Sequence, residues 1–111
     1  MFSLFSTKPK KYEDISAAIF QDLAQQQDIE ILDVRTSEEF SSGKILGARN
    51  IDIRNPDFLT QIKKLPRDKT YLIYCRSGAR SAQASEVLSE LGFENVKNLS
   101  GGVIRWPFGL V

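Results

Sequence analysis

The chain has 111 residues, which is enough for one domain with a buried core and too few for two. Its 41% hydrophobic and 26% charged residues are typical of a globular domain and argue against a disordered or fibrous chain. The net charge of +1 provides no excess of cations to neutralise a phosphate backbone, so we expect no nucleic-acid partner.

The N-terminal end is predicted to be a loose leader over residues 1–12, followed by one domain over residues 13–111. The leader places its lysines after a short apolar patch, the reverse of a secretory signal, and lacks the arginines of a mitochondrial presequence. No apolar run approaches the ~20 residues that cross a bilayer. Together with an unpaired cysteine, these features predict a cytoplasmic protein without a membrane partner.

The first half of the domain alternates between predicted helices and strands. Ser16 can cap a helix, and IEILDV at residues 29–34 follows as a strand. The apolar side of that helix carries Ile19, Phe20 and Leu23. Thr36 and Glu39 have the spacing of a capping box and open a second, short helix. ARNIDI at residues 48–53 is a predicted short strand.

A third helix and a central strand are predicted next. Asn55 followed by Pro56 marks the helix start, and Pro66 ends the helix. Its buried face carries Phe58, Leu59 and Ile62. TYLIY at residues 70–74 is too short for a helix and has no polar interruption, which is typical of a central parallel strand covered on both faces.

The last third predicts a helix, a strand and a short terminal helix. Apolar residues recur from Ala84 to Leu91 at helical spacing, and Gly92 supplies the C-terminal stop. NVKNL at residues 95–99 is the last strand, and GGVIRW at 101–106 is a turn leading into the short helix. Alternating strands and helices predict an α/β fold with a parallel sheet and helices on both faces.

Cys75 follows the predicted central strand, at the edge of the sheet where ligands bind in such folds. The next helix begins shortly afterwards, and its first turn leaves about four amides unpaired beside a partial positive charge. If the backbone amides of residues 76–81 point inward, they form an anion-binding nest around the sulfur, and Gly78 allows the necessary curl. Together with Arg76 and Arg80, this setting predicts a thiol with a lowered pKa that meets an anionic substrate.

Two alternatives remain open for this thiol. A lone cysteine at a strand end is often an inert small hydrophobe, whereas arginines are costly to bring near a core without an anionic partner.

Histidine is absent from the chain, which excludes Ser-His and Cys-His catalytic pairs. With one cysteine and no histidine, the usual metal-ligand sets are missing, so we expect neither a metal nor an organic cofactor.

Three ordered motifs resemble those of the single-domain rhodanese family of sulfurtransferases. They are LDVRTSEEFSSGKILGARNIDI, YLIYCRSGARSAQASEVLSELGF and LSGGVIRW, and the likeness extends from about Ile15 to Trp106. The resemblance implies a rhodanese-like sheet of five parallel strands, flanked by helices on both faces. It also implies that Cys75 takes sulfane sulfur from a small anionic donor such as thiosulfate, forms a persulfide, and passes the sulfur to cyanide or a thiol, including a protein thiol.

The resemblance also implies roles for the residues after Cys75. Arg76 and Arg80 match positions that bind the sulfonate of the donor. Backbone amides that would hold the substrate come from Ser77, Gly78, Ala79 and Ser81. Lys44 departs from the commoner family pattern, which has a histidine there. We interpret that position as scaffold, so the change is expected to affect stability or pH behaviour more than activity.

Two other functions are considered. A rhodanese-like domain could be a non-catalytic module that binds or relays sulfur on a partner protein, although the intact CRSGAR loop argues against an inactive version. In phosphatases and arsenate reductases that share this fold, the similar loop has Cys followed by five residues and then Arg. In this chain only four residues separate Cys75 from Arg80. The shorter loop favours a single outer sulfur atom over a phosphate-sized group.

Two further groups of residues have a structural interpretation. Asp33 and Arg35, at a strand end, are expected to form a buried or half-buried pair that fixes neighbouring loops, with Glu39 as a second partner for Arg35. Trp106 could shield the mouth of the site, but packing in the core is the favoured interpretation.

Overall fold

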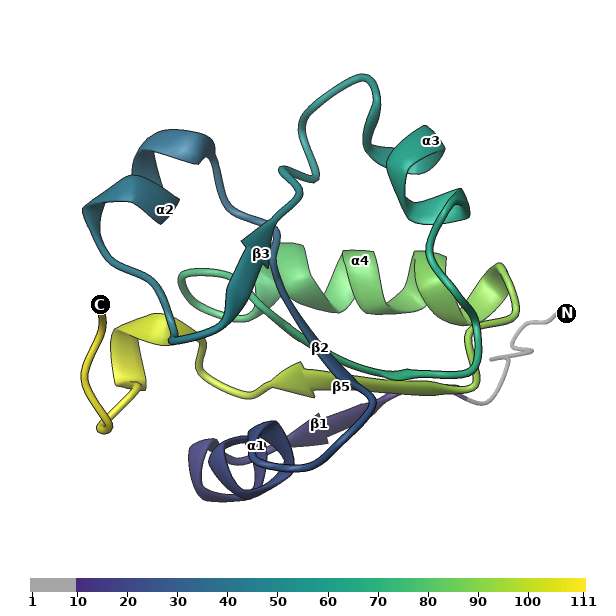
Figure 1. Ribbon diagram of the computed structural model, residues 1–111. Coiled ribbons are helices and arrows are strands. Elements are labelled where there is room, and N and C mark those ends of the chain that lie inside the picture. Colours follow the sequence, from purple (N-terminus) through teal and green to yellow (C-terminus); the bar gives the residue numbers. More distant parts are fainter. Residues whose placement is uncertain (1–9) are drawn as a thin grey trace, which may run out of the picture.

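The computed structural model describes residues 10–111 as one sheet with helices packed on both of its faces (Figure 1). The strands are parallel and have the order β1-β5-β4-β2-β3. They are β1 (Glu13–Ile15), β2 (Ile29–Asp33), β3 (Ala48–Asn50), β4 (Thr70–Tyr74) and β5 (Asn95–Leu99). The helices are α1 (Ala17–Ala24), α2 (Ser37–Ser42), α3 (Phe58–Lys63), α4 (Ala79–Glu90) and the 3-10 helix η1 (Val103–Arg105). The predicted α/β architecture is therefore confirmed.

The strand β4 lies at the centre of the sheet, as its unbroken apolar sequence predicted. Its residues from Tyr71 to Tyr74 are fully buried. Successive side chains of a strand point to opposite faces, so Tyr71 and Ile73 belong to one core cluster while Leu72 and Tyr74 belong to the other. Cys75 continues this alternation and lies in the same cluster as Ile73.

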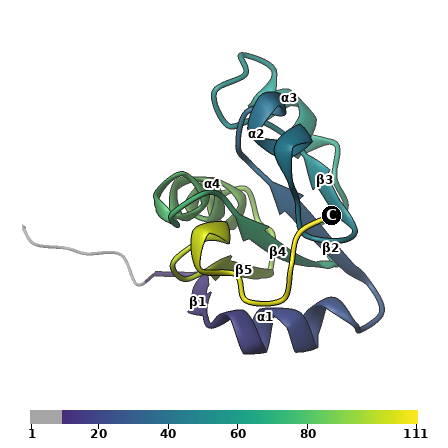
Figure 2. The same cartoon turned by 90° about the vertical axis from the view of Figure 1, so that its left-hand side faces the viewer.

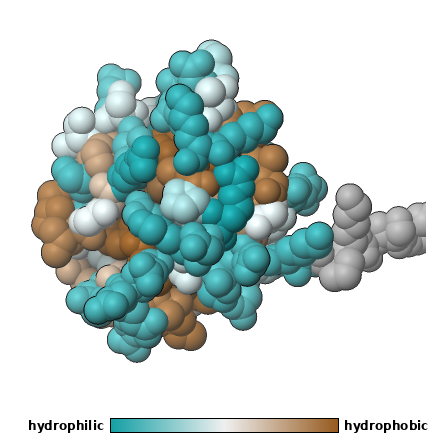
Figure 3. Space-filling model, turned by 45° about the vertical axis from the view of Figure 1, so that its right-hand side comes forward, coloured by the Kyte–Doolittle hydropathy of each residue, from teal (hydrophilic) through white to brown (hydrophobic). Residues whose placement is uncertain are grey.

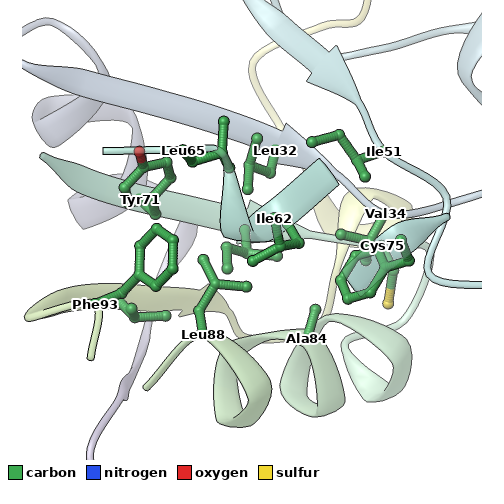
Figure 4. Close-up of a cluster of buried hydrophobic side chains, with 13 residues drawn as sticks. Leu32, Val34, Ile51, Ile62, Leu65, Tyr71, Cys75, Ala84, Leu88 and Phe93 are labelled. Carbon is green, nitrogen blue, oxygen red and sulfur yellow. The ribbon is translucent and has the colours of Figure 1, made fainter. Parts of the chain in front are cut away.

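The two faces of the sheet are covered by different helices (Figure 2). On one face α3 and α4 contribute Ile62, Ala84 and Leu88 to the cluster that contains Cys75 (Figure 4). On the other face α1 buries Phe20 completely. The Ser16 side chain caps α1 by accepting a hydrogen bond from the Ile19 amide at 3.2 Å, as predicted.

Several boundaries differ from the sequence prediction. Ile19 is 51% exposed and Leu59 is 44% exposed, because each lies at the margin of the apolar side of a short helix rather than at its centre. The helix α3 begins at Phe58 and not at Pro56, since the Asn55 side chain accepts a hydrogen bond from the Asp57 amide at 2.7 Å and forms a turn there. The predicted strand at 48–53 pairs regularly only over β3.

The strand β1 was not predicted, because three residues with only Ile15 buried carry no periodic signal. It pairs with β5 at the edge of the sheet. The predicted leader lies mostly outside the described residues, which exclude 1–9. Within the described part, Tyr12 packs against the cluster that contains Cys75, and Lys10 forms an ion pair with Asp14.

The surface of the molecule is mixed in polarity. Figure 3 shows a face on which hydrophilic side chains surround smaller hydrophobic patches. Among residues 10–111, helices that combine the length and apolar character needed to cross a bilayer are absent.

Candidate active site

Cys75 lies between the end of β4 and the start of α4, with its sulfur against the backbone of the loop that joins them. We call residues 75–81 the Cys75 loop. The Gly78 amide donates a hydrogen bond to Cys75 Sγ at 3.1 Å, and the Ser81 hydroxyl oxygen lies 3.4 Å from the same atom. Cys75 is only 1% exposed. In Figure 4 its sulfur lies at one end of the buried hydrophobic cluster, beside the first turns of α4. Among the amides of residues 76–81, which were predicted to point inward, the Gly78 amide bonds the sulfur directly.

The curl depends on the backbone conformation of Gly78. This residue is the N-cap of α4 and has a φ of +108°, a region that side chains with a Cβ avoid. Ser81, in the first turn of the helix, is completely buried and also lies 3.1 Å from the Gly78 carbonyl oxygen. Its single hydroxyl proton can serve either the sulfur or this carbonyl, so the hydroxyl can respond when the thiol loses its proton.

The loop stabilises the charged form of Cys75. Burial raises the pKa of the thiol, but hydrogen bonds from the Ser81 hydroxyl and from the amides of Ser81, Gly78 and Ser77 outweigh burial and lower the pKa below its ordinary value. Backbone amides at a helix start therefore stabilise the thiolate in the way that an imidazolium does in Cys-His pairs.

The two arginines of the Cys75 loop have different surroundings. Arg76 is exposed. Arg80 donates two hydrogen bonds to Glu39 in α2, at 2.8 Å and 3.0 Å, in a bidentate ion pair. The Arg80 guanidinium, helped by the Thr36 amide and hydroxyl and opposed by burial, lowers the pKa of Glu39 to about 2. The ion pair is therefore fully formed at neutral pH.

The turn at Gly101 and Gly102 supports the Cys75 loop from behind. A Cβ atom on Gly102 would lie 2.2 Å from the Arg76 carbonyl oxygen, so the two backbones approach each other more closely than any side chain permits. The Val103 amide donates to the Cys75 carbonyl at 2.9 Å, and the Ile104 amide donates to the Arg76 carbonyl at 3.1 Å. These contacts fix the backbone that presents the sulfur.

Comparison with known proteins agrees with this geometry. The sequence model of the protein family described as rhodanese-like domain matches residues 16–107 of this chain. The chain belongs to the rhodanese-like family. A sulfurtransferase of Allochromatium vinosum is 40% identical over 82% of this chain and 83% of its own length, and a putative sulfurtransferase of Bacillus subtilis is 35% identical over 82% and 85%. The crystal structure of a rhodanese-like domain protein from Staphylococcus aureus superposes with a TM-score of 0.76 at 29% identity, covering 89% of this chain and 96% of that one.

In this rhodanese-like domain the predicted site residues fall into two groups. Cys75, Gly78 and Ser81 meet at the sulfur. The side chains of Arg76, Ser77 and Ala79 are exposed on the loop, and Arg80 is turned toward Glu39. Their predicted contacts with a substrate remain predictions.

The predicted pair of Asp33 and Arg35 is confirmed. Arg35 donates from Nη2 to Asp33 at 2.6 Å and from Nε to both carboxylate oxygens at 3.0 Å, and both residues are buried. Arg35 Nη2 also donates to the Gly43 carbonyl at 2.6 Å, which ties the end of β2 to the end of α2. The prediction that Glu39 pairs with Arg35 was wrong. Glu39 points from the first turn of α2 toward α4 and pairs with Arg80 instead.

Trp106 and Lys44 both have scaffold contacts. Trp106 packs edge-on against Phe20, with ring centroids 5.5 Å apart, in the cluster on the face opposite Cys75. Core packing, the favoured interpretation, therefore describes Trp106 better than shielding of the site. The Lys44 ammonium lies 4.9 Å from the centre of the Phe40 ring, and its backbone exchanges two hydrogen bonds with Val111.

Two contributions to the site escaped the sequence analysis. The sequence analysis assigned Glu39 to the capping box, whose two hydrogen bonds are both present, and to Arg35, so its contact with Arg80 had no separate signal. Gly102 carried a usable signal, because paired glycines indicate an unusual backbone, but its contact with the Cys75 loop depends on tertiary structure.

Proposed function

We propose that this protein is a sulfurtransferase that carries sulfane sulfur on Cys75 as a persulfide. The observation that supports the proposal is the contact of the Cys75 sulfur with the Gly78 amide and the Ser81 hydroxyl, in a loop whose hydrogen bonds lower the pKa of the thiol without a histidine. A nucleophile activated in this way suits reactions that need a thiolate and leave an anion in its place.

The proposed cycle has two displacements at sulfur. The Cys75 thiolate attacks the outer sulfur of thiosulfate, a new S–S bond forms, and the old S–S bond breaks with its electron pair leaving on sulfite. The terminal sulfur of the resulting persulfide is again an anion, and the loop amides stabilise it as they stabilised the thiolate. An acceptor such as cyanide or a thiolate then attacks that sulfur, which yields thiocyanate or a new persulfide and restores the Cys75 thiolate.

The remaining loop residues would bind the donor. Arg76 is exposed and free to reach the sulfonate, and the side of Arg80 that Glu39 leaves open could share in this contact. The amide of Ala79, at the first position of α4, belongs to the same set of donors. A single thiol that must remain reduced between turnovers is compatible with the cytoplasm.

Intact-protein mass spectrometry tests the proposal directly. The protein is incubated with thiosulfate, separated from excess reagent and weighed, and we expect a gain of one sulfur atom that cyanide then removes. Cys75→Ser is the matched control, since it replaces only the sulfur, and it should gain nothing. If several donors, including a small-molecule persulfide, leave the wild-type mass unchanged, the proposal is wrong and the alternative of a non-catalytic binding module is favoured.

A further inference from the structure

The acidic residue Glu39 contacts the Cys75 loop through Arg80, a contact that the sequence did not predict. Glu39 accepts both of its strong hydrogen bonds from Arg80, at 2.8 Å and 3.0 Å, while its backbone and one carboxylate oxygen complete the capping box with Thr36. Side chains in this pair are partly shielded, with 19% of Arg80 and 29% of Glu39 exposed. A bidentate pair of this kind is stronger than an ordinary exposed pair.

Arg80 couples electrically to Cys75 as well as to Glu39. The pKa of the Arg80 guanidinium is raised above its ordinary value by its hydrogen bonds to Glu39 and by the negative charges of Glu39, Cys75 and Asp52, although burial opposes this shift. Because Glu39 neutralises Arg80, an incoming anion meets less positive charge at the site than the sequence CRSGAR suggests. A dianion is more affected than a monoanion or a neutral molecule, since the electrostatic energy scales with the charge of the ligand.

We propose that Glu39 is a specificity-determining residue of the Cys75 site, which disfavours dianionic sulfur donors and favours donors with one negative charge or none, such as organic persulfides. The proposal rests on the sulfurtransferase function and deepens it. Glu39 acts through Arg80 and not on the reacting atoms, so a dianion such as thiosulfate must compete with the carboxylate for the guanidinium.

Glu39→Gln separates this role from the structural role of the residue. Glutamine also completes capping boxes at this helix position, so the variant should keep α2 and lose only the negative charge. Glu38→Gln is the matched control. Glu38 is exposed in the same first turn of α2, so its substitution removes an equal charge and leaves the ion pair of Arg80 in place. Unfolding in urea should be measured for both variants to show that they fold.

The first measurement does not depend on sulfur transfer. Iodoacetate and iodoacetamide alkylate the same thiolate and differ mainly in charge, so the ratio of their rates at Cys75 reports the charge that an anion meets. Because iodoacetate carries one charge, we expect this ratio to rise about twofold to threefold in Glu39→Gln and to change less than about 1.5-fold in Glu38→Gln. An unchanged ratio in Glu39→Gln would overturn the inference even if the wild-type protein forms a persulfide. Failure of both reagents to modify the thiol would overturn it too, together with the proposed function.

The second measurement concerns the donor. We expect Glu39→Gln to lower the KM for thiosulfate about threefold to tenfold, and to change the KM for an alkyl persulfide, a monoanion at neutral pH, about half as much on a logarithmic scale. Equal effects on both donors would show that Glu39 has only a structural role. If the alkylation ratio rises but thiosulfate never yields a persulfide, the electrostatic role of Glu39 stands and the proposed use of thiosulfate fails.

Discussion

Two anionic groups lie at the carboxyl ends of neighbouring strands, and they are stabilised in opposite ways. Asp33, at the end of β2, is paired with a full positive charge, since Arg35 contacts both of its carboxylate oxygens and both residues are buried. Cys75, just after β4, has neutral direct partners, which are a backbone amide and a hydroxyl. Both sites are almost inaccessible to water, so the difference lies in the partner and not in burial.

This difference separates a scaffold from a reactive group. An ion pair with fixed geometry uses every lone pair of the carboxylate and leaves nothing for a substrate. Dipoles stabilise the thiolate by a smaller amount and do not neutralise it, so the sulfur keeps its nucleophilicity. Arg80, a cation whose charge interacts with that of Cys75, is itself paired with Glu39. We therefore expect substitutions at Asp33 to affect stability and substitutions in the Cys75 loop to affect chemistry.

The largest expected effect is that of Asp33→Asn. This substitution leaves the Arg35 charge buried and unpaired, which should lower the free energy of unfolding by about 3–5 kcal/mol. Urea unfolding measures the loss. The control is Glu30→Gln, which breaks the more exposed ion pair between Lys69 and Glu30 and should cost less than about 1 kcal/mol. If the two variants lose similar stability, the Asp33 pair is not the scaffold that we describe.

The next prediction compares two glycines whose backbone conformations are similarly strained for other residues and whose surroundings differ. Gly78 has a φ of +108° and Gly92 a φ of +93°, and alanine at either position should cost about 1–3 kcal/mol of stability. A Cβ on Gly92 would meet nothing within 4 Å. Only Gly78→Ala disturbs the amide that bonds the Cys75 sulfur, so only this variant should also slow persulfide formation, by at least about tenfold.

Mass spectrometry over time gives the rate of persulfide formation, and urea unfolding gives the loss of stability, for both glycine variants. Equal rates in Gly78→Ala and Gly92→Ala would contradict the role that we assign to the Gly78 amide.

Much of this architecture could be predicted from short-range patterns. The Cys75 loop was predictable because a strand, a glycine and a helix start are contiguous, so their geometry is local. The capping box at Thr36 and Glu39 and the central strand at 70–74 were predictable for the same reason. The edge strand β1 was missed, since three residues with one buried side chain resemble a loop until β5 is placed beside them.

The partners of charged residues were harder to predict than their positions. Glu39 was assigned to Arg35, four residues away in the chain, and it pairs with Arg80, which is distant in sequence. Sequence proximity favoured Arg35, which was the wrong cation. The Arg35 guanidinium already forms an ion pair with Asp33. The contact of Gly102 with the Arg76 carbonyl is likewise a tertiary one. Local chemistry thus identified the proposed nucleophile, whereas the electrostatics around it required the fold.

The smallest effect tests the neutral partners of Cys75 themselves. Ser81→Ala removes the hydroxyl that lies 3.4 Å from the sulfur. Because a hydrogen bond of this kind is worth about 0.5–1.5 kcal/mol, its loss should raise the pKa of Cys75. The dependence of the iodoacetamide rate on pH measures that pKa. Ser85→Ala is the control, because Ser85 lies one turn further along α4, is also buried and bonds the Ser81 carbonyl instead of the sulfur.

The same pair of variants predicts a change in stability with pH. The folded protein lowers the pKa of Cys75 below its ordinary value of 9.0, so the thiolate contributes stability that is complete above pH 9.0 and is lost as the pH falls through the folded pKa. Ser81→Ala brings the pKa of Cys75 in the folded protein closer to its ordinary value. The free energy of unfolding of this variant should therefore rise less between pH 7 and pH 9 than that of Ser85→Ala. Parallel pH profiles for the two variants would mean that the hydroxyl does not stabilise the thiolate, and that the backbone amides alone provide its charge stabilisation.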